Sequence, residues 1–343
     1  MEHLNIRDFI YAFVKYVDLG GELTHRELGR ALGEELRAEI FHNLEIYSSA
    51  GMRKDVSDKI LNQLIATAER NFPNYIEELR GIAEGSAAKL EDILKFSFEE
   101  EIGGCKSIAV ASGSRFILGH NEDWDLPMNL YIIRAKPEGK PGFISVGYAG
   151  QIPGTCASLN ENGIAYSANS LDTEITFSGL PKIYLLRSLL EANSISDAES
   201  LMNLGGRTIG NNCLIASARE KRIASLEWSP DNYDIINGEK FLAHANHYLS
   251  PKMRKEQNKQ TRASSENAFK RAEELLKRLK EPKIEDIKRI LQDHKGYPDS
   301  ICRHLKERGS TRTIASVMIN SEDNAFYVSY GNPCENEYKK FSL

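Results

Sequence analysis

A cysteine behind two glycines is the first feature of this 343-residue chain that could carry chemistry. Cys105 follows Gly103 and Gly104 and precedes an apolar run at 108–111. Its thiol is a potential nucleophile, and glycine lets a peptide bend into conformations that other residues resist. Taken alone, the triplet equally fits a turn followed by a buried cysteine. Its meaning therefore depends on the polar residues downstream.

Four polar clusters follow Cys105 along the chain. They are His-Asn-Glu-Asp-Trp-Asp at 120–125, His-Ala-Asn-His-Tyr at 244–248, Ile-Cys-Arg-His at 301–304 and Ser-Thr-Arg-Thr at 310–313. Carboxylates at the end of a strand are usually solvated, and an arginine that opens a strand usually lies at an edge. Each cluster by itself is therefore weak evidence for a site.

The sequence offers no convincing metal motif. His244 and His247 have metal-like spacing but lack a third ligand and the glutamate of a metallopeptidase helix. Cys302-x-His304 supplies only two ligands. The five cysteines are scattered without Cys-x-x-Cys spacing, which favours a reducing compartment and predicts no metal site.

Taken together, the order of these motifs resembles the family of acyl-coenzyme A:6-aminopenicillanic acid acyltransferase, also called isopenicillin N acyltransferase. Relatives of that enzyme include amidases that cleave acyl-amine conjugates. The resemblance is carried by 77–85, Gly104-Cys105, 119–124, 162–165, 244–247 and 301–304, and by the serine-containing strand after Arg312. It covers most of the chain, and six motifs in the right order make coincidence improbable.

The resemblance implies an N-terminal nucleophile hydrolase of the α+β class. Its fold would be a four-layer αββα sandwich of two antiparallel sheets flanked by helices. Residues 1–104 would form a mainly helical pro-segment or α chain, and residues 105–343 the catalytic β chain, both in one compact domain. Autocleavage would fall between Gly104 and Cys105.

The resemblance also implies roles for four residues. Cys105 would be the nucleophile, Asp123 and Arg312 its polar partners, and Asn246 a contributor to the oxyanion hole. Cleavage would free an α-amino group with a pKa near ~8, close to the ~8.5 of a cysteine thiol, so nucleophile and base would share one residue. No catalytic histidine is then required.

Lys106 departs from the family, where a small hydroxyl residue is expected. A cation beside the nucleophile favours the thiolate. Alternatively, the side chain points outward along the strand, away from the nucleophile. Both interpretations stay open at the level of sequence.

The expected function is hydrolysis of a linear amide in an acyl-amine, acyl-amino acid or peptide-like conjugate through an acyl-enzyme. Acyl transfer to another acceptor is the second expected function, because water is the default acceptor unless a pocket excludes water. One alternative is a thiol hydrolase that uses His244, His247 or His304 as base. The other is a non-enzymatic binding protein, which has no physical reason to keep a costly polar cluster.

Aromatic residues could form the substrate pocket. Trp124, Tyr131 and Tyr148 are the candidates, and packing in the core is at least as good an explanation for each. The expected partners are a small-molecule acyl-amide substrate and, second, acyl-coenzyme A. A homo-oligomer is left open, and no cofactor is expected.

The elements that would position these residues follow from sequence periodicity. A strand is expected at 9–17, ended by Gly20-Gly21, and a capping box at Thr24 and Glu27 opens a helix over 24–47. Gly29 and Gly33 on that helix would allow close packing. Further helices are expected at 55–71, 75–84, 90–100, 181–192, 195–204, 265–280 and 284–293. Further strands are expected at 107–111, 115–120, 131–136, 143–148, 155–160, 164–169, 212–218, 223–227, 232–236, 313–319 and 325–330. Such runs of strands and helices indicate α+β layering.

Composition excludes several functional classes. The chain is 41% hydrophobic and 27% charged, which is enough to bury a sizeable core. Its 44 basic and 49 acidic residues are interspersed and give a net charge of -5, so neither nucleic acid nor an anionic membrane is an expected partner. The first 21 residues lack signal-peptide features, and no segment approaches the ~20 apolar residues of a spanning helix. We therefore expect a cytoplasmic protein.

Overall fold

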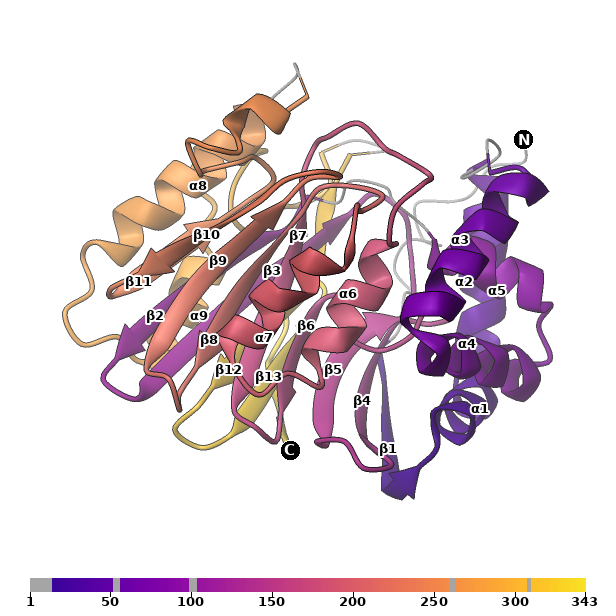
Figure 1. Ribbon diagram of the computed structural model, residues 1–343. Helices are drawn as coiled ribbons and strands as arrows, with labels where there is room; N and C mark the ends of the chain where they lie inside the picture. Colours follow the sequence, from indigo (N-terminus) through magenta and orange to yellow (C-terminus); the bar gives the residue numbers. More distant parts are fainter. Residues whose placement is uncertain (1–13, 52–55, 99–103, 259–262, 307–309) are drawn as a thin grey trace.

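The computed structural model describes residues 14–51, 56–98, 104–258, 263–306 and 310–343. Gly103 and residues 9–13 of the first expected strand lie outside the described residues. Within them, two β-sheets stack face to face and helices cover the outer face of each, which gives four layers (Figure 1). The expected αββα architecture of the α+β class is confirmed.

In the part of the chain that the structure describes, the larger sheet has eight strands and the smaller has six. In spatial order the larger comprises β1 (Val14–Leu23), β4 (Leu130–Pro137), β5 (Phe143–Tyr148), β6 (Ala157–Asn160), β7 (Ile164–Ser170), β8 (Asn211–Ser217), β9 (Arg222–Trp228) and β10 (Tyr233–Gly238). The smaller comprises β11 (Phe241–His244), β2 (Lys106–Ser112), β3 (Arg115–Trp124), β12 (Arg312–Asn320), β13 (Ala325–Tyr330) and β14 (Lys339–Ser342). Cys105 therefore immediately precedes β2, a strand inside the smaller sheet.

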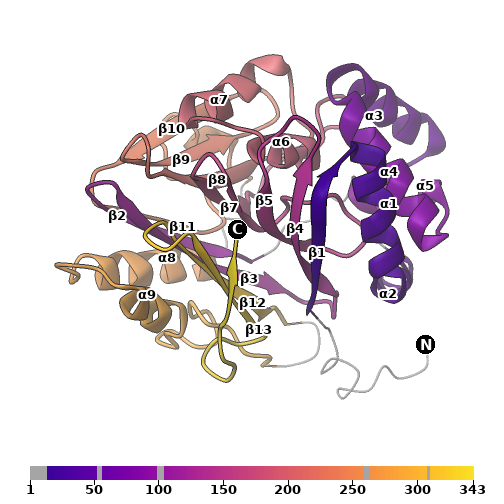
Figure 2. The same cartoon turned by 90° about the horizontal axis from the view of Figure 1, so that it is seen from below.

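Helices on the outer faces bury the remaining apolar surface. The larger sheet is covered by α1 (His25–Glu35), α2 (Arg37–Ser49), α3 (Asp58–Asn71), α4 (Pro73–Ser86), α5 (Leu90–Ser97), α6 (Lys182–Leu189) and α7 (Ile195–Ser200). The smaller sheet is covered by α8 (Ala263–Leu276) and α9 (Ile284–Leu291), which lie beneath it in Figure 2. Separate apolar clusters fill the two helix–sheet interfaces and the space between the sheets.

Several expected elements differ from the structure. The larger sheet is not wholly antiparallel, because β1 runs parallel to β4 with Val14 opposite Leu130. The pair Gly20-Gly21 does not end β1; the register shifts there, and the strand continues to Leu23. The single helix expected at 24–47 is divided at Leu36 into α1 and α2. The short strands β11 and β14 were not expected.

The most consequential difference lies in β3. The strand was expected to end at His120, but it continues to Trp124. The polar run therefore belongs to a buried strand and not to a solvated loop. Its side chains alternate between the two faces of the sheet, which decides how the site is built.

The segment before Cys105 is integrated into the fold. Besides the pairing of β1 with β4, a fully buried ion pair joins α4 to α6, with Arg187 Nη2 2.6 Å from Glu78 Oε1. His25 Nδ1 also lies 2.6 Å from that oxygen. Because neither charge has access to water, separating the two helices would leave both uncompensated.

Glycines allow α1 and α4 to pack backbone against backbone. Gly29 and Gly33 on α1 face α4, where Gly81 and Gly85 lie. A Cβ on Gly33 would lie 2.4 Å from the carbonyl oxygen of Ile82, a distance that no real Cβ tolerates. The expected close approach is thus confirmed. The glycines of α4 that take part in it belong to the sequence stretch at 77–85.

We expect Gly33→Ala to destabilise the protein strongly. The new methyl group meets backbone atoms of α4, so the helices must separate, at a cost of about 3 kcal/mol. Urea denaturation measures this cost. Gly20→Ala is the matched control, because nothing lies within 4 Å of its Cβ position, and it should change stability by less than about 0.5 kcal/mol. Equal effects of the two substitutions would contradict the packing.

Candidate active site

Alternation along β2 separates two neighbouring functional groups. Ala109 belongs to the apolar cluster between the sheets, whereas Ile108 belongs to the cluster under α8 and α9. Cys105 shares the parity of Ala109, so its thiol points between the sheets. Lys106 shares the parity of Ile108 and points to the outer face. The second interpretation of Lys106, that it points away from the nucleophile, is the one the structure supports.

On the inner face, the thiol lies beside a buried carboxylate. One ligand atom each from Cys105, His120 and Glu122 lies within 4.8 Å of the others. Tyr148 Oη donates to Glu122 Oε1 at 2.6 Å, and His120 Nε2 lies 2.8 Å from Glu122 Oε2. Burial, followed by the charge of Glu122, raises the pKa of the Cys105 thiol well above its ordinary value. In the uncut chain the thiol is thus protonated at neutral pH.

The same carboxylate is held in its charged form. Burial alone would raise the pKa of Glu122, but hydrogen bonds with His120 and Tyr148 hold it below its ordinary value. Ser107 Oγ lies 2.9 Å from His120 Nδ1, so both ring nitrogens of that histidine have partners. Glu122 is therefore an ordered acceptor next to the thiol.

On the outer face, Asp123 is surrounded by donors. Lys106 Nζ forms a short contact with Asp123 Oδ2, and Thr313 Oγ1 donates to Oδ1 at 2.7 Å. Arg303 Nε lies 3.7 Å from Oδ2. The amide of Gly104 donates to the main-chain carbonyl of Asp123 at 3.2 Å. Asp123 thus lies beside the peptide that joins Gly104 to Cys105.

Burial gives Lys106 an unusual proton affinity. It lowers the pKa of the ammonium group to about 8, although the charge of Asp123 acts in the opposite direction. Arg303 also disfavours the charged form. The charge of this outer cluster consequently changes within the pH range in which enzymes are assayed.

The structure brings together two of the four expected catalytic residues directly. Cys105 and Asp123 meet at the start of β2, where β3 pairs with it. Asn246 lies two residues beyond His244, the end of β11, which is opposite Ser107. Its Nδ2 donates to the carbonyl of Ser170 at 3.0 Å, at the wall of the cavity described below.

The role expected for Arg312 stays a prediction, but the structure does not pair this residue with Asp123. This residue opens β12 opposite Trp124, whereas its neighbour Thr313 lies opposite Asp123 and bonds to it. Alternation therefore places Arg312 on the other face of the sheet from the carboxylate. The cations that balance Asp123 are Lys106 and Arg303, and Arg303 comes from the Ile-Cys-Arg-His motif.

A cavity opens on the thiol side of Cys105. Its non-atom space is about 690 Å³, which includes open solvent at its mouth. Its apolar wall comprises Phe96, Trp124, Met128, Tyr148, Ala168, Ile183 and Leu186, and its polar groups include Lys182 and Asn211. Trp124 and Tyr148 thus lie where a pocket was expected. Tyr131 does not, because it is fully buried in the core and donates to the carbonyl of Gln151.

Two polar groups in the cavity wall are available to a ligand. Ser97 Oγ and Trp124 Nε1 are buried and make no hydrogen bond with the described part of the chain. Both residues line the cavity together with Cys105. A buried donor without a partner is costly, and a bound amide or carboxylate would satisfy it.

The histidines considered as bases are engaged elsewhere. His244 Nε2 lies 2.7 Å from Glu227 Oε1, and His247 Nδ1 lies 2.7 Å from Ser265 Oγ. His304 Nε2 lies 3.3 Å from Cys334 Sγ, on the outer side of the smaller sheet. His120 is the histidine placed near the thiol, and sequence reasoning missed it. The available signal was that His120, Glu122 and Trp124 are spaced two residues apart, which places them on one face of a strand.

The inner trio could in principle offer ligands to a metal ion. Cys105, His120 and Glu122 supply one thiol, one imidazole and one carboxylate. Their ligand atoms already satisfy one another and Tyr148, however, and a nucleophile must keep its sulfur free. The expectation that catalysis here needs no metal or cofactor stays a prediction.

Residues 110–335 match the family of acyl-coenzyme A:6-aminopenicillanic acid acyl-transferase. The chain belongs to this family. The matched region contains Asp123, Asn246, Arg303 and Arg312, and it begins five residues after Cys105. The resemblance inferred from the sequence motifs is confirmed.

Two curated proteins are similar in sequence. The beta-alanyl-dopamine/carcinine hydrolase of Drosophila melanogaster is 28% identical over 230 residues, which cover 56% of this chain and 58% of the hydrolase. The chain thus matches little more than half the length of that relative. The 40 kDa form of acyl-coenzyme A:6-aminopenicillanic-acid-acyltransferase of Emericella nidulans is 25% identical over 342 residues, with 91% and 94% coverage.

Solved structures of amide hydrolases are more distant. The conjugated bile acid hydrolase of Clostridium perfringens has a TM-score of 0.49 and 11% identity, covering 70% of this chain and 97% of the hydrolase. The penicillin V acylase of Agrobacterium tumefaciens has a TM-score of 0.45 and 12% identity, covering 66% and 82%.

Lys106 should leave a signature in the pH dependence of stability. Its pKa is about 8 in the folded chain and near ~10.4 when unfolded, so the unfolded state binds more protons between these values. In the Cys105→Ala background, which stays uncut, the chain with Lys106 should therefore gain stability over the chain with Lys106→Met as pH rises from 8 to 10, by about 1 kcal/mol per pH unit. Chemical denaturation of both proteins across that range measures the difference. Parallel curves would show that Lys106 stays charged.

Proposed function

We propose that the protein is a self-processing cysteine N-terminal nucleophile amidohydrolase. One observation carries this proposal: the Gly104–Cys105 peptide lies between Asp123 on one face of the sheet and a cavity lined by Cys105 on the other. Membership of a family whose named relatives include a hydrolase and an acyltransferase supports it.

Self-processing begins when the Cys105 thiol attacks the carbonyl carbon of Gly104. The bond between the Gly104 carbonyl carbon and the Cys105 nitrogen breaks as the thioester forms, and the thiol proton passes to that nitrogen, with Glu122 as the neighbouring hydrogen-bond acceptor. Water then hydrolyses the thioester, which leaves a carboxylate on Gly104 and an α-amino group on Cys105. Asp123, already beside this peptide, accepts a hydrogen bond from the new ammonium group.

Arg303 is placed to hold the other product of the cut. Its Nη1 lies 3.3 Å from the position that a Cβ on Gly104 would occupy. Its Nε is buried and makes no hydrogen bond within the described residues. A carboxylate formed on Gly104 would satisfy this donor, so Arg303 favours the cut state over the uncut one.

Turnover of an external substrate uses the new amine as base. It takes the proton of the thiol, and the thiolate attacks the amide carbonyl to give an acyl-Cys105 intermediate. Asn246 is the proposed oxyanion donor, a role worth roughly 3 kcal/mol where such a donor has been removed elsewhere. The proton passes to the leaving amine, and water then releases the acid.

The cavity wall indicates the class of substrate. Phe96, Met128 and Ile183 suit an apolar acyl chain, whereas Ser97 and Trp124 can bind the polar amide. We propose linear amides of acyl-amine, acyl-amino acid or peptide-like conjugates. Hydrolysis is preferred to transfer onto an acceptor, with acyl-coenzyme A as the second candidate partner.

Both products of the cut should stay in one domain. Phe96 and Ser97 of the segment before Cys105 line the cavity with residues after it. The proposed boundary therefore separates residues 1–104 from 105–343 in covalent terms only.

In the described residues, no helix is long and apolar enough to cross a membrane. The five free cysteines support the proposed cytoplasmic location.

Intact-mass analysis tests the processing step. Wild-type protein should give fragments that end at Gly104 and start at Cys105, whereas Cys105→Ala should remain one chain. Cys213→Ala is the matched control, because that buried cysteine lies in the apolar cluster between the larger sheet and its helices and does not line the cavity. This variant should be cut like the wild type. A fully active wild type that stays uncut would refute the proposal.

An ordinary thiol hydrolase is the second candidate, because His120 lies near the Cys105 sulfur. That candidate predicts activity in the uncut chain and its loss in His120→Gln. The leading proposal predicts activity only after the cut. Release of free acid from a panel of N-acyl amines, compared between uncut and cut preparations, separates the two.

The same panel tests hydrolysis against transfer. Purified mature protein should release free acid from at least one N-acyl amine without any added acceptor. Addition of a second amine should change the product distribution little, because the cavity is open to water at its mouth. Formation of the exchanged amide in excess over the acid would identify an acyltransferase instead.

A further inference from the structure

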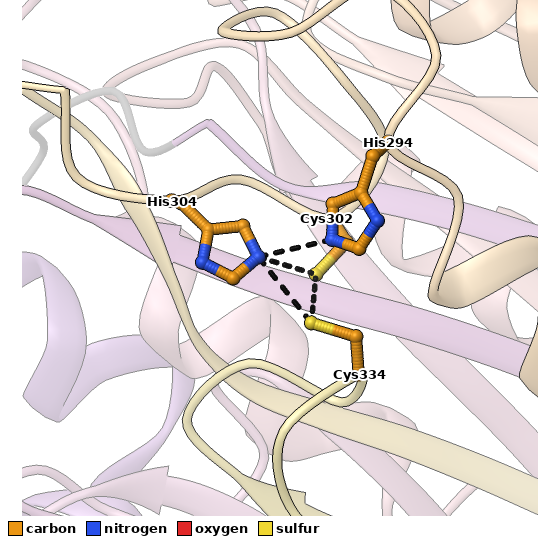
Figure 3. Close-up of side chains that lie close together, drawn as sticks. All are labelled: His294, Cys302, His304 and Cys334. Atoms are coloured by element: carbon orange, nitrogen blue, oxygen red, sulfur yellow. Dashed lines mark hydrogen bonds between the residues drawn. The ribbon is translucent and has the colours of Figure 1, made fainter.

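Four potential metal ligands converge on the outer side of the smaller sheet. They are His294, Cys302, His304 and Cys334, whose side chains point toward one another in Figure 3. His294 lies just after α9, Cys302 and His304 lie in the segment that leads to β12, and Cys334 lies between β13 and β14. The sequence predicts no metal site because Cys302-x-His304 has only two ligands; the fold brings two more.

The spacing of these atoms is that of a tetrahedral site. The two sulfurs are 3.6 Å apart and the two Nε2 atoms 3.0 Å apart. His304 Nε2 lies 3.3 Å from Cys334 Sγ and 3.9 Å from Cys302 Sγ. Around tetrahedral zinc, sulfur pairs lie about 3.8 Å apart, nitrogen pairs about 3.3 Å and mixed pairs about 3.5 Å. These four of the six distances agree within a few tenths of an ångström, and the other two, from His294 to the sulfurs, are within 4.8 Å.

We propose that His294, Cys302, His304 and Cys334 bind one Zn²⁺ ion in a structural site. Binding forms two zinc–sulfur and two zinc–nitrogen bonds and releases two thiol protons to solvent. Because all four positions are filled by the protein, none remains for water or substrate, as expected of a structural ion rather than a catalytic one.

Groups around the ligands resemble the outer shell of a metal site. Glu335 Oε1 lies 3.5 Å from His304 Nδ1, so it can orient the ring and fix the tautomer that presents Nε2 to the ion. Asn332 Nδ2 lies 3.4 Å from Cys302 Sγ and can stabilise a thiolate. A hydrophobic packing role for Cys302 would not require either group.

The segments are already held in place before any ion binds. Cys302 N donates to the carbonyl of Asp293 at 3.0 Å, which joins it to the turn that carries His294. Gln292 Nε2 donates to the carbonyl of Pro333 at 2.7 Å, next to Cys334. A preorganised site loses little conformational entropy when it binds its ion.

The ion would also fix a residue of the active site. Arg303 lies between two ligands, Cys302 and His304, and its guanidinium faces Asp123 and Gly104. A bound ion restrains the main chain on both sides of Arg303. Zinc would thus act as a positioning element for the cut, a consequence that rests on the proposed function, whereas zinc binding itself does not.

Metal analysis of the full-length protein tests the site. After expression with zinc and desalting in reducing buffer, the wild type should retain close to one zinc per chain. Cys334→Ser and His294→Ala should each weaken zinc binding at least 100-fold, measured by competition with a chromophoric chelator. Both positions are at the surface, so the variants should fold, which circular dichroism checks. Cys213→Ala removes one thiol elsewhere and should retain the zinc.

Two further measurements sharpen the test. Glu335→Gln should weaken zinc binding about 10-fold, as loss of an outer-shell partner does. Cobalt in place of zinc should give the visible bands of a tetrahedral site and a thiolate charge-transfer band, and Cys334→Ser should lower the latter. Absence of zinc from the wild type, equal zinc in all variants, or a Cys302–Cys334 disulfide in reducing buffer would overturn the proposal.

The outcome is separable from that of the proposed function. Cys105→Ala should bind zinc like the wild type although it cannot be cut. A chain that cuts itself without holding zinc would refute the metal site alone. A chain that holds zinc but is never cut would refute the proposed function alone.

Discussion

Alternation of side chains at the start of β2 is the constraint on which the site depends. It directs the Cys105 thiol into the cavity between the sheets and the Lys106 ammonium group toward Asp123 on the opposite face. The Gly104–Cys105 peptide therefore lies between a ligand cavity and a buried ion cluster. A shift of the strand register by one residue would move each of these two side chains to the opposite face of the sheet.

The buried cluster explains why two cations accompany one carboxylate. Asp123 has no access to water, so its charge must be balanced within the fold. Lys106 and Arg303 lie beside this carboxylate, and Arg303 also lies 3.6 Å from a carboxylate oxygen of Asp299. Burial lowers the pKa of Lys106 to about 8. Cleavage would add a carboxylate on Gly104 and an ammonium group on Cys105, so it would leave the net charge of this region unchanged.

The described part of the segment before Cys105 packs closely against the rest of the chain. The glycines of α1 and α4 bring these helices together, and Glu78 on α4 pairs with Arg187 on α6 in the absence of water. Because these contacts do not involve the peptide before Cys105, they would survive its cleavage. The cavity would keep the wall that Phe96 contributes.

The family resemblance implied the four layers, and sequence patterns were sufficient to predict most of the elements, because apolar periodicity reports which face of an element is buried. They were insufficient for β3 beyond His120, where buried polar residues satisfy one another across strands and leave no apolar pattern. The family resemblance implied Arg312 as a partner of Asp123, whereas the strand register places Thr313 opposite that carboxylate. The four potential zinc ligands span residues 294–334 in three segments, so only the fold could bring them together.

The central claim is that Cys105 attacks as an N-terminal residue, and a trapped acyl-enzyme tests it most directly. An N-acyl amine that the protein hydrolyses would be mixed with mature protein, quenched in acid within the first turnover, and digested for peptide mass analysis. The account predicts an acyl thioester on a peptide whose first residue is Cys105. An acyl group on any other residue, or on Cys105 still joined to Gly104, would contradict it.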